Sequence, residues 1–202
     1  MRRFTEDTLL VATHNAGKLE EISTLLAPFG VAVTSAEEMG LTEPEEIETT
    51  FVGNARIKAH TAARATGLPA LADDSGIMID ALGGAPGVYT ANWAETETGR
   101  DFVMAMTRAH DELLACKAPQ PWTARFCCTL VLAWPDGTDV VFDGIAEGWF
   151  VWPMRGQDGH GYDPVFQPLG HELTFGEMEG HRKNQISHRA DAFSKFVAAC
   201  FA

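Results

Sequence analysis

Two adjacent aspartates followed by a serine and a glycine are the residues best suited to chemistry in this chain. Asp73-Asp74-Ser75-Gly76 comes directly after the short apolar stretch Leu71-Ala72. Magnesium usually takes one or two carboxylates and completes its shell with water and substrate phosphate oxygens. The same four residues are also typical of an Asx turn that binds nothing. Because successive side chains of a strand point to opposite faces, we expect only one of the two carboxylates to face a ligand.

A second polar segment, Thr13 to Lys18, stands where an apolar run gives way to a helical pattern. Backbone N–H groups, the helix dipole, a hydroxyl and an ammonium at such a turn can converge on phosphate oxygens. The segment lacks the glycine and lysine spacing of a P-loop, and Thr or Asn is equally an ordinary helix cap. Taken alone, it favours the cap.

Three further segments carry groups of polar side chains. The acidic run Glu43, Glu45, Glu46 and Glu48 is by default a solvated loop, although one of its members could bring a second carboxylate to the same metal. The stretches from Gly159 to Pro164 and from Lys183 to Arg189 combine aromatic rings, a carboxylate and basic groups. Either stretch could also be a plain loop or a helix start.

The hydrophobic pattern predicts an α/β fold in which a mixed sheet is flanked by helices. The two aspartates fall at the tip of a probable short strand, where open α/β sheets usually hold their ligands. The strongest hairpin signal is the alternation that runs up to the turn at Pro135-Asp136-Gly137. Strands are expected at 9–12, 31–33, 71–72, 124–134 and 140–145. One helix is expected after Gly17 and up to Pro28, and further helices at about 51–66, 100–115 and 188–201.

Composition excludes several classes of function. The 202 residues carry 15 basic and 28 acidic side chains, a net charge of −13, which disfavours nucleic-acid binding but not a small anion held by local cations. The apolar stretch near the N-terminus is too short for a signal sequence or a membrane span, so we expect a cytoplasmic protein of one domain, residues 1–202. The four cysteines form no Cys-x-x-Cys pair, which favours buried free thiols over disulfides or zinc.

Six motifs, in order along nearly the whole chain, resemble those of the inosine triphosphate pyrophosphatase family, also called the Ham1-like or dITP/XTP pyrophosphatases. The motifs are Thr13-His14-Asn15-Ala16-Gly17-Lys18, Phe51-Val52-Gly53-Asn54-Ala55, Asp73-Asp74-Ser75-Gly76, Leu82-Gly83-Gly84-Ala85-Pro86-Gly87, Gly161-Tyr162-Asp163-Pro164 and Ser187-His188-Arg189.

The resemblance implies an elongated α/β fold with two lobes around an active-site cleft, a homodimer, and cleavage of purine nucleoside triphosphates with Mg²⁺. The substrates would be dITP, ITP and XTP, and the products a monophosphate and pyrophosphate. By motif match, Asp74 is expected to bind the metal and to act as general base, and Lys18 to assist catalysis. Glu46 resembles the second metal ligand, with Glu45 as the fallback.

The remaining nucleotide contacts are also carried over by motif. The segment Thr13 to Lys18 would hold the triphosphate, and a second set of residues would hold the rest of the nucleotide, with His188 and Arg189 near the purine. One position departs from the family pattern, since His160 stands where the family usually has Phe. The second set consists of Ser75, His160, Gly161, Tyr162, Asp163, Lys183, His188 and Arg189.

Two other functions compete with this interpretation. The related Maf-like pyrophosphatases act on pyrimidine or modified nucleotides, and the order of motifs here favours the purine group. A nucleotide-binding protein without catalysis would bind tightly and not turn over, although the chain retains both Asp74 and Lys18. The products formed from purine and pyrimidine triphosphates separate all three cases.

Overall fold

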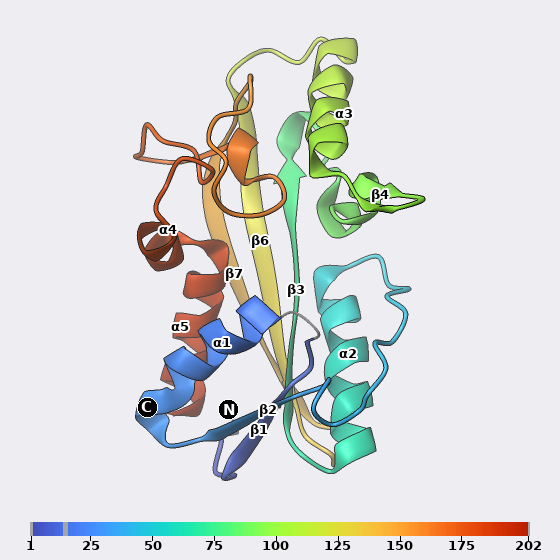
Figure 1. Ribbon diagram of the computed structural model, residues 1–202, viewed down its shortest axis with the longest axis vertical. Helices are drawn as coiled ribbons and strands as arrows, with labels where there is room; N and C mark the ends of the chain where they lie inside the picture. Colours follow the sequence, from blue (N-terminus) through green and yellow to red (C-terminus); the bar gives the residue numbers. More distant parts are fainter. Residues whose placement is uncertain (1, 14–15, 202) are drawn as a thin grey trace. The chain divides into compact units, whose positions relative to one another are not determined.

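A mixed six-stranded sheet with helices forms the framework of the protein, which confirms the predicted fold class (Figure 1). The computed structural model describes residues 2–13 and 16–201, without the side chains of residues 16–18 and 21. The strand order is β2-β1-β3-β6-β7-β8, with β1 parallel to β2 and β3, and β7 antiparallel to β8. The strands are β1 (Thr8–Val11), β2 (Ala32–Ser35), β3 (Ala70–Ile79), β6 (Trp122–Ala133), β7 (Asp139–Phe150) and β8 (Phe166–Pro168), with a separate pair β4 (Glu95–Thr96) and β5 (Gly99–Arg100).

The five α-helices of the described residues are α1 (Ala16–Leu26), α2 (Phe51–Thr66), α3 (Phe102–Ala115), α4 (Gly180–Ile186) and α5 (His188–Cys200). The predicted helices at 51–66, 100–115 and 188–201 are confirmed within two residues at each end. The short α4 and the short strands β4, β5 and β8 were not predicted. They are too brief to show a hydrophobic period.

The chain divides into two compact units, and the divisions fall inside β3, β6, β7 and α5. The first unit comprises residues 1–74, 129–143 and 192–202, and the second comprises residues 75–128 and 144–191. Each unit has its own hydrophobic core. The prediction of one domain over residues 1–202 concerns independent folding and stays a prediction.

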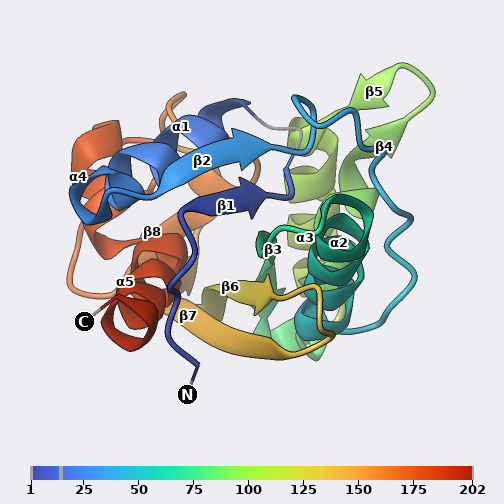
Figure 2. The same ribbon diagram turned by 90° about the horizontal axis from the view of Figure 1, so that it is seen from below.

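In the first unit, α2 packs on the sheet through a face of alanines. Ala55, Ala59 and Ala63 are completely buried, and they share a core with Leu10 of β1 and Val131 of β6. The Thr50 hydroxyl caps the helix by accepting a hydrogen bond from Gly53 N at 3.1 Å. Figures 1 and 2 both place α2 on one side of the strands and α1 and α5 on the other. Small side chains let the helix approach the sheet closely, so polar residues on the same face come close to β3.

Strand β3 differs from the prediction in one respect that matters for the site. The prediction of a short strand with the two aspartates at its tip was wrong. Strand β3 runs without interruption for ten residues and contains Asp73 and Asp74 in its middle. The turn propensity of Asp73-Asp74-Ser75-Gly76 is overridden by burial of the neighbouring residues. Leu71 before this segment and Ile77 and Ile79 after it are fully buried. The two aspartates therefore have the fixed backbone of a strand and not the freedom of a turn.

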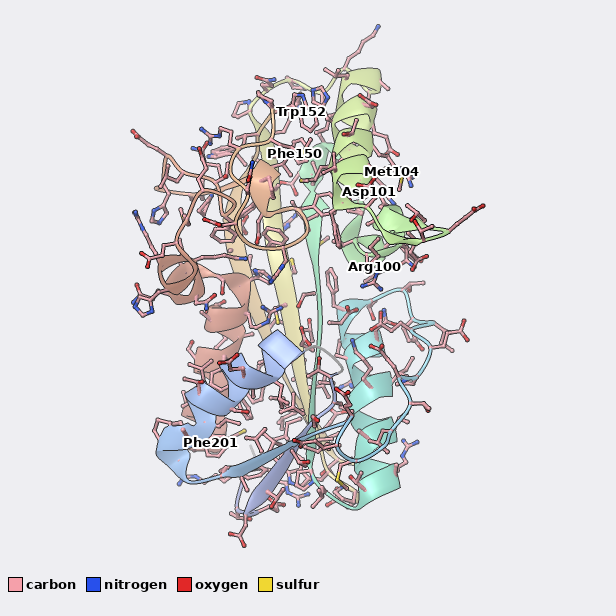
Figure 3. All side chains as sticks on the ribbon, in the orientation of Figure 1. Arg100, Asp101, Met104, Phe150, Trp152 and Phe201 are labelled. Carbon is pink, nitrogen blue, oxygen red and sulfur yellow. The ribbon has the colours of Figure 1, made fainter. Side chains whose placement is uncertain are left out.

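The second unit has a core rich in aromatic residues. Phe126, Phe150, Phe166, Phe175 and Tyr162 are at most 6% exposed. Phe150 and Trp152 lie at the end of β7, and the Asp101 carboxylate caps α3 by accepting a hydrogen bond from Met104 N at 2.9 Å (Figure 3). This core gives the surrounding loops of the unit a rigid support.

Two smaller expectations concern the burial of the cysteines and the presence of membrane-spanning helices. None of the four cysteines forms a disulfide, and Cys128 and Cys200 are buried as predicted. The prediction of burial was wrong for Cys116, which is exposed at the end of α3. Among the described residues, no helix has both the length and the apolar character needed to cross a membrane.

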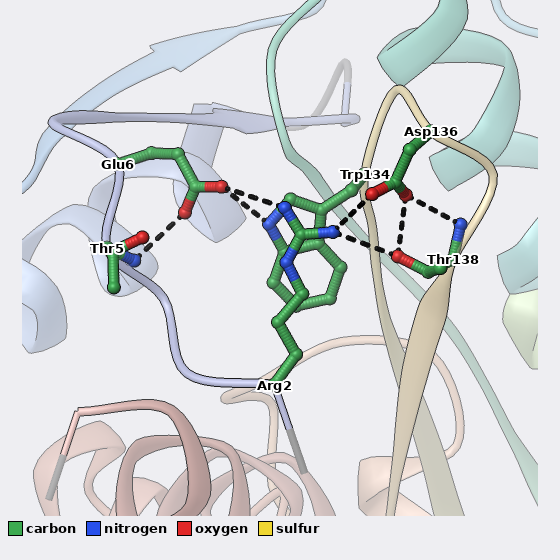
Figure 4. Close-up of polar contacts among 6 residues, drawn as sticks. All are labelled: Arg2, Thr5, Glu6, Trp134, Asp136 and Thr138. Carbon is green, nitrogen blue, oxygen red and sulfur yellow. Dashed lines mark hydrogen bonds and ion pairs between the residues drawn. The ribbon is translucent and has the colours of Figure 1, made fainter.

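Arg2 fastens the N-terminal segment to the β6–β7 hairpin in the first unit (Figure 4). Its guanidinium lies 4.2 Å from the centroid of the Trp134 ring and forms ion pairs with Asp136 at 2.6 Å and Glu6 at 3.3 Å. The indole N–H of Trp134 donates to Glu6 at 2.8 Å, which closes the group. Hydrogen bonds from the Thr138 hydroxyl and N–H, then from Arg2, lower the pKa of Asp136 to about 2.

We expect the Asp136→Ala variant to unfold at lower urea concentration than the wild type at pH 7. A carboxyl whose pKa is lowered on folding contributes stability above its unfolded value of 3.8, and that contribution is lost as the pH falls toward about 2. Urea unfolding followed by circular dichroism at a series of pH values measures the difference. A deficit that stays constant down to the lowest pH at which the protein folds would contradict the assignment.

Candidate functional site

The ammonium group of Lys58 lies among acidic side chains of the first unit. It donates a hydrogen bond to Glu46 Oε1 at 2.6 Å, and the Lys58 side chain is only 10% exposed. Asp73 and Asp74, both buried, interact electrostatically with the same ammonium. Burial works to lower the pKa of Lys58, but Asp73 and Glu46 outweigh burial, so the pKa is raised. The lysine stays charged and compensates the carboxylates around it.

Asp74 is a strongly perturbed carboxyl group of this cluster. Burial raises its pKa to about 6, and the charges of Glu46 and Asp73 act in the same direction. The positive charge of Lys58 and the hydrogen bond from Asn54 act against this rise. A carboxyl group with a pKa near 6 can accept a proton close to neutral pH, which is the property required of a general base.

Asn54 connects Asp74 to the acidic loop that precedes α2. Its Nδ2 donates to Asp74 Oδ2 at 3.2 Å, and its Oδ1 accepts a hydrogen bond from Glu48 N at 2.9 Å. Asn54 is 3% exposed. One buried amide thus fixes both the orientation of Asp74 and the path of residues 46–48.

Sequence reasoning did not single out Lys58 or Asn54 as functional residues. The signal was present, because both lie four residues apart on the apolar alanine face of α2, where an unpaired lysine is very costly. A charged residue on the buried stripe of a predicted helix indicates a partner of opposite charge. The structure identifies that partner as Glu46.

The predicted triphosphate segment is described only in part. Thr13 is half-buried and its N–H donates to Val11 O at 2.9 Å, and α1 begins at Ala16. His14 and Asn15 lie outside the described residues, as do the side chains of Ala16, Gly17 and Lys18. Their expected contacts with phosphate remain predictions.

The carboxylates of the first unit suit a magnesium ion that arrives with a phosphate ligand. Within residues 2–13 and 16–201, no group of three or more His, Cys, Asp or Glu side chains forms a ready-made metal site. Magnesium does not need one, because it commonly binds one or two carboxylates and takes its other ligands from water and phosphates. Glu46 and Asp74 provide hard oxygen donors of this kind, and their mutual repulsion favours a cation near them.

In the second unit, Asp163 holds two other predicted site residues, His160 and Lys183. Its carboxylate, almost completely buried, accepts hydrogen bonds from His160 N at 2.6 Å and from the Lys183 ammonium. The backbone of Gly159 passes so close that a Cβ atom there would lie 2.0 Å from Asp163 Oδ2. Asp163 therefore positions the glycine-rich loop and Lys183 together, and only glycine fits at position 159.

Arg155 fastens the beginning of the same loop. Its guanidinium donates to Gln167 Oε1 at 2.9 Å and to Glu172 O at 3.2 Å, and its backbone N–H donates to Pro164 O at 2.8 Å. The loop from Gly156 to Gly161 is thus closed at both ends by buried or half-buried hydrogen bonds. Its exposed member His160 is held by its backbone, which leaves the imidazole facing solvent.

The other predicted contacts of the second unit differ in accessibility. Ser75, Gly161 and Arg189 are half-buried, whereas Tyr162 is 1% exposed and its ring meets that of Phe102 edge to face at 6.3 Å. The Tyr162 side chain is part of the core, so any contact it makes with a nucleotide would come from its backbone. His188 is 8% exposed, and its ring lies against Phe126.

A family model, sequence relatives and a solved structure all relate this chain to the same family. The Ham1 family model matches residues 9–199. A dITP/XTP pyrophosphatase of Ruegeria pomeroyi is 69% identical over 99% of this chain and 98% of its own length, and one of Rhizobium meliloti is 54% identical over 99% of each chain. The solved structure of a HAM1 protein from Coxiella burnetii has a TM-score of 0.90 at 34% identity and covers 96% of this chain and 98% of its own.

The agreement covers the sequence from end to end and the course of the backbone, and it includes the segments that carry Asp74, Asp163 and His188. The chain therefore belongs to the Ham1 family.

Proposed function

We propose that this protein hydrolyses dITP, ITP and XTP to the nucleoside monophosphate and pyrophosphate. The observation that carries the proposal is the group of Asp74, Glu46 and Lys58, in which Asp74 and Lys58 are buried and burial raises the pKa of Asp74 to about 6. The relatives from Ruegeria pomeroyi and Rhizobium meliloti are named for this activity, which supports the same substrates.

Hydrolysis of a phosphoanhydride requires an oriented water and compensation of negative charge, with little covalent chemistry from the protein. In the proposed reaction, Asp74 orients the water and accepts its proton as the new P–O bond forms and pyrophosphate departs. Asn54 holds the carboxylate in place for this step. A Mg²⁺ ion held by Asp74 and Glu46 would neutralise phosphate charge and lower the pKa of bound water. Lys58, with Lys18 as predicted from the motif, would supply further positive charge.

Selection of the base is assigned to the residues of the second unit. A donor aimed at a 6-oxo group accepts hypoxanthine and xanthine, whereas the 6-amino group of adenine leaves that donor unpaired at a cost of about 1 to 3 kcal/mol. Lys183, His188 and Arg189 provide such donors, and Asp163 fixes the first of them. His160, in the exposed part of the loop, is proposed to lie against the base.

We further propose that the protein acts as a homodimer without nucleic-acid or membrane partners. The dimer is supported only by the resemblance to the family, and the net charge of −13 disfavours polyanions. Sedimentation equilibrium at micromolar concentration should give twice the chain mass of 21.9 kDa. A single species at the chain mass would contradict the dimer.

Turnover of six triphosphates in the presence of Mg²⁺ tests the substrate class. We expect ITP, dITP and XTP to release pyrophosphate at least about 100-fold more efficiently than ATP, because one or two base hydrogen bonds are left unmade with adenine. Pyrophosphate and orthophosphate are quantified separately, with GTP and TTP as further comparisons. Release of orthophosphate, or a preference for TTP, would contradict the proposal and favour another phosphohydrolase or a Maf-like enzyme.

The Asp74→Asn variant should lose about 10³-fold in kcat while remaining folded, because an amide cannot accept the proton of the attacking water. Asp101→Asn is a matched control, since asparagine also caps a helix and Asp101 lies at the start of α3. The control should keep the wild-type rate. Activity of Asp74→Asn near that of the control would overturn the assigned role.

The same Asp74→Asn change should stabilise the metal-free protein. The pKa of Asp74 is raised from 3.8 to about 6 on folding, so ionisation of the folded state lags behind that of the unfolded state. The resulting loss of stability begins above about pH 4 and is complete above about pH 6. At about 1.4 kcal/mol per pKa unit, and with allowance for screening, this loss reaches about 2 kcal/mol. Urea unfolding in EDTA should show the variant more stable than wild type at pH 7 and equal to it at pH 4. A variant that is less stable at pH 7 would show that the carboxylate is favourably paired.

A further inference from the structure

The imidazole of His188 lies in a stack of buried aromatic rings in the second unit. Phe126 of β6 packs face to face with His188, with ring centroids 4.9 Å apart and an interplanar angle of 13°. Phe126 is also nearly parallel to Phe175, at 6.0 Å and 16°, and meets the edge of Phe166 at 4.7 Å. Because Phe126 is 6% exposed and Phe166 and Phe175 are fully buried, the Phe126 ring cannot turn without disturbing the core.

Two backbone anchors hold the start of α5, where His188 is the first residue. The Ser187 hydroxyl accepts a hydrogen bond from Ala190 N at 3.1 Å, and Asp191 Oδ2 accepts one from Ile145 N at 3.0 Å. These bonds fix the backbone at His188. The face-to-face contact with Phe126 restricts the plane of its imidazole.

The same aromatic group also contacts Lys183, another basic residue assigned to the base. The Lys183 ammonium lies 5.6 Å from the centroid of the Phe175 ring and donates to Asp163. Phe126 and Phe175 therefore support both Lys183 and His188, although neither phenylalanine has a polar atom. An arrangement of this kind keeps hydrogen-bond donors at fixed angles without using further polar groups.

We propose that Phe126 is a positioning residue for base selection, which sets the plane of the His188 imidazole against the purine of the substrate. The proposal rests on the proposed function, in which His188 contacts the base. Hydrogen bonds from an imidazole lie in the plane of its ring, and they weaken steeply with misalignment. Tilting the ring lowers the free-energy difference between a 6-oxo and a 6-amino purine and leaves the chemistry at the phosphates unchanged.

The test compares Phe126→Met with Phe150→Met. Phe150 is a matched control, because it is 2% exposed in the same core and its ring contact is to Trp122 at 6.1 Å. Methionine nearly conserves volume and removes the planar ring, so both variants should lose similar stability in thermal unfolding. For Phe126→Met alone, we expect the ratio of kcat/KM for ITP to that for ATP to fall about 5- to 10-fold, the effect of one weakened hydrogen bond.

Phe126→Tyr, which keeps a planar ring, should retain the wild-type ratio. Phe126→Leu gives a second measurement if the methionine variant fails to fold. An unchanged ratio in a folded Phe126→Met or Phe126→Leu variant, or an equal fall in Phe150→Met, would overturn the positioning role and leave the proposed function intact. Failure of the wild type to release pyrophosphate from ITP would overturn the proposed function and this inference with it.

Discussion

Compensation of buried negative charge by the Lys58 ammonium is the constraint on which the first unit depends. Asp73 and Asp74 are carried into the interior by a continuous strand, and an isolated ionised carboxylate in such a place is very unfavourable. Lys58 lies on α2 beside them and forms its hydrogen bond to Glu46. The balance is incomplete, since the pKa of Asp74 still rises to about 6. This residual excess of negative charge is what makes the group attractive to a cation and useful as a base.

The two units hold their polar groups by different physical means. The charges around Lys58 in the first unit are close together and only partly balanced, and those of Asp73, Asp74 and Lys58 are buried. The second unit holds its polar groups with aromatic packing and with the single carboxylate of Asp163. Phosphate chemistry requires charge compensation, whereas recognition of a base requires fixed hydrogen-bond angles, and the two sets of contacts match these separate requirements.

Sequence patterns predicted best the elements that show a clear hydrophobic period. The helix at 51–66 and the hairpin around Pro135-Asp136-Gly137 are of this kind. The predicted extent of β3 was wrong because Asp73-Asp74-Ser75-Gly76 has the composition of a turn. Only strand pairing and burial extend β3 through this segment. Candidate site residues such as Asp74 and Lys183 were proposed from motifs. Asn54, Lys58 and Phe126 were missed because their roles depend on partners far away in the sequence.

The alanine face of α2 has a consequence for how this sequence can change during evolution. Asn54 and Lys58 lie between Ala55, Ala59 and Ala63, which are fully buried against the sheet. Any larger side chain at these alanines would push the helix outward and move the amide and the ammonium away from Asp74 together. Under the proposed mechanism, these alanines have no functional group of their own but are under the same selection as Asp74. A survey of tolerated substitutions would not separate these alanines from the residues that perform the chemistry.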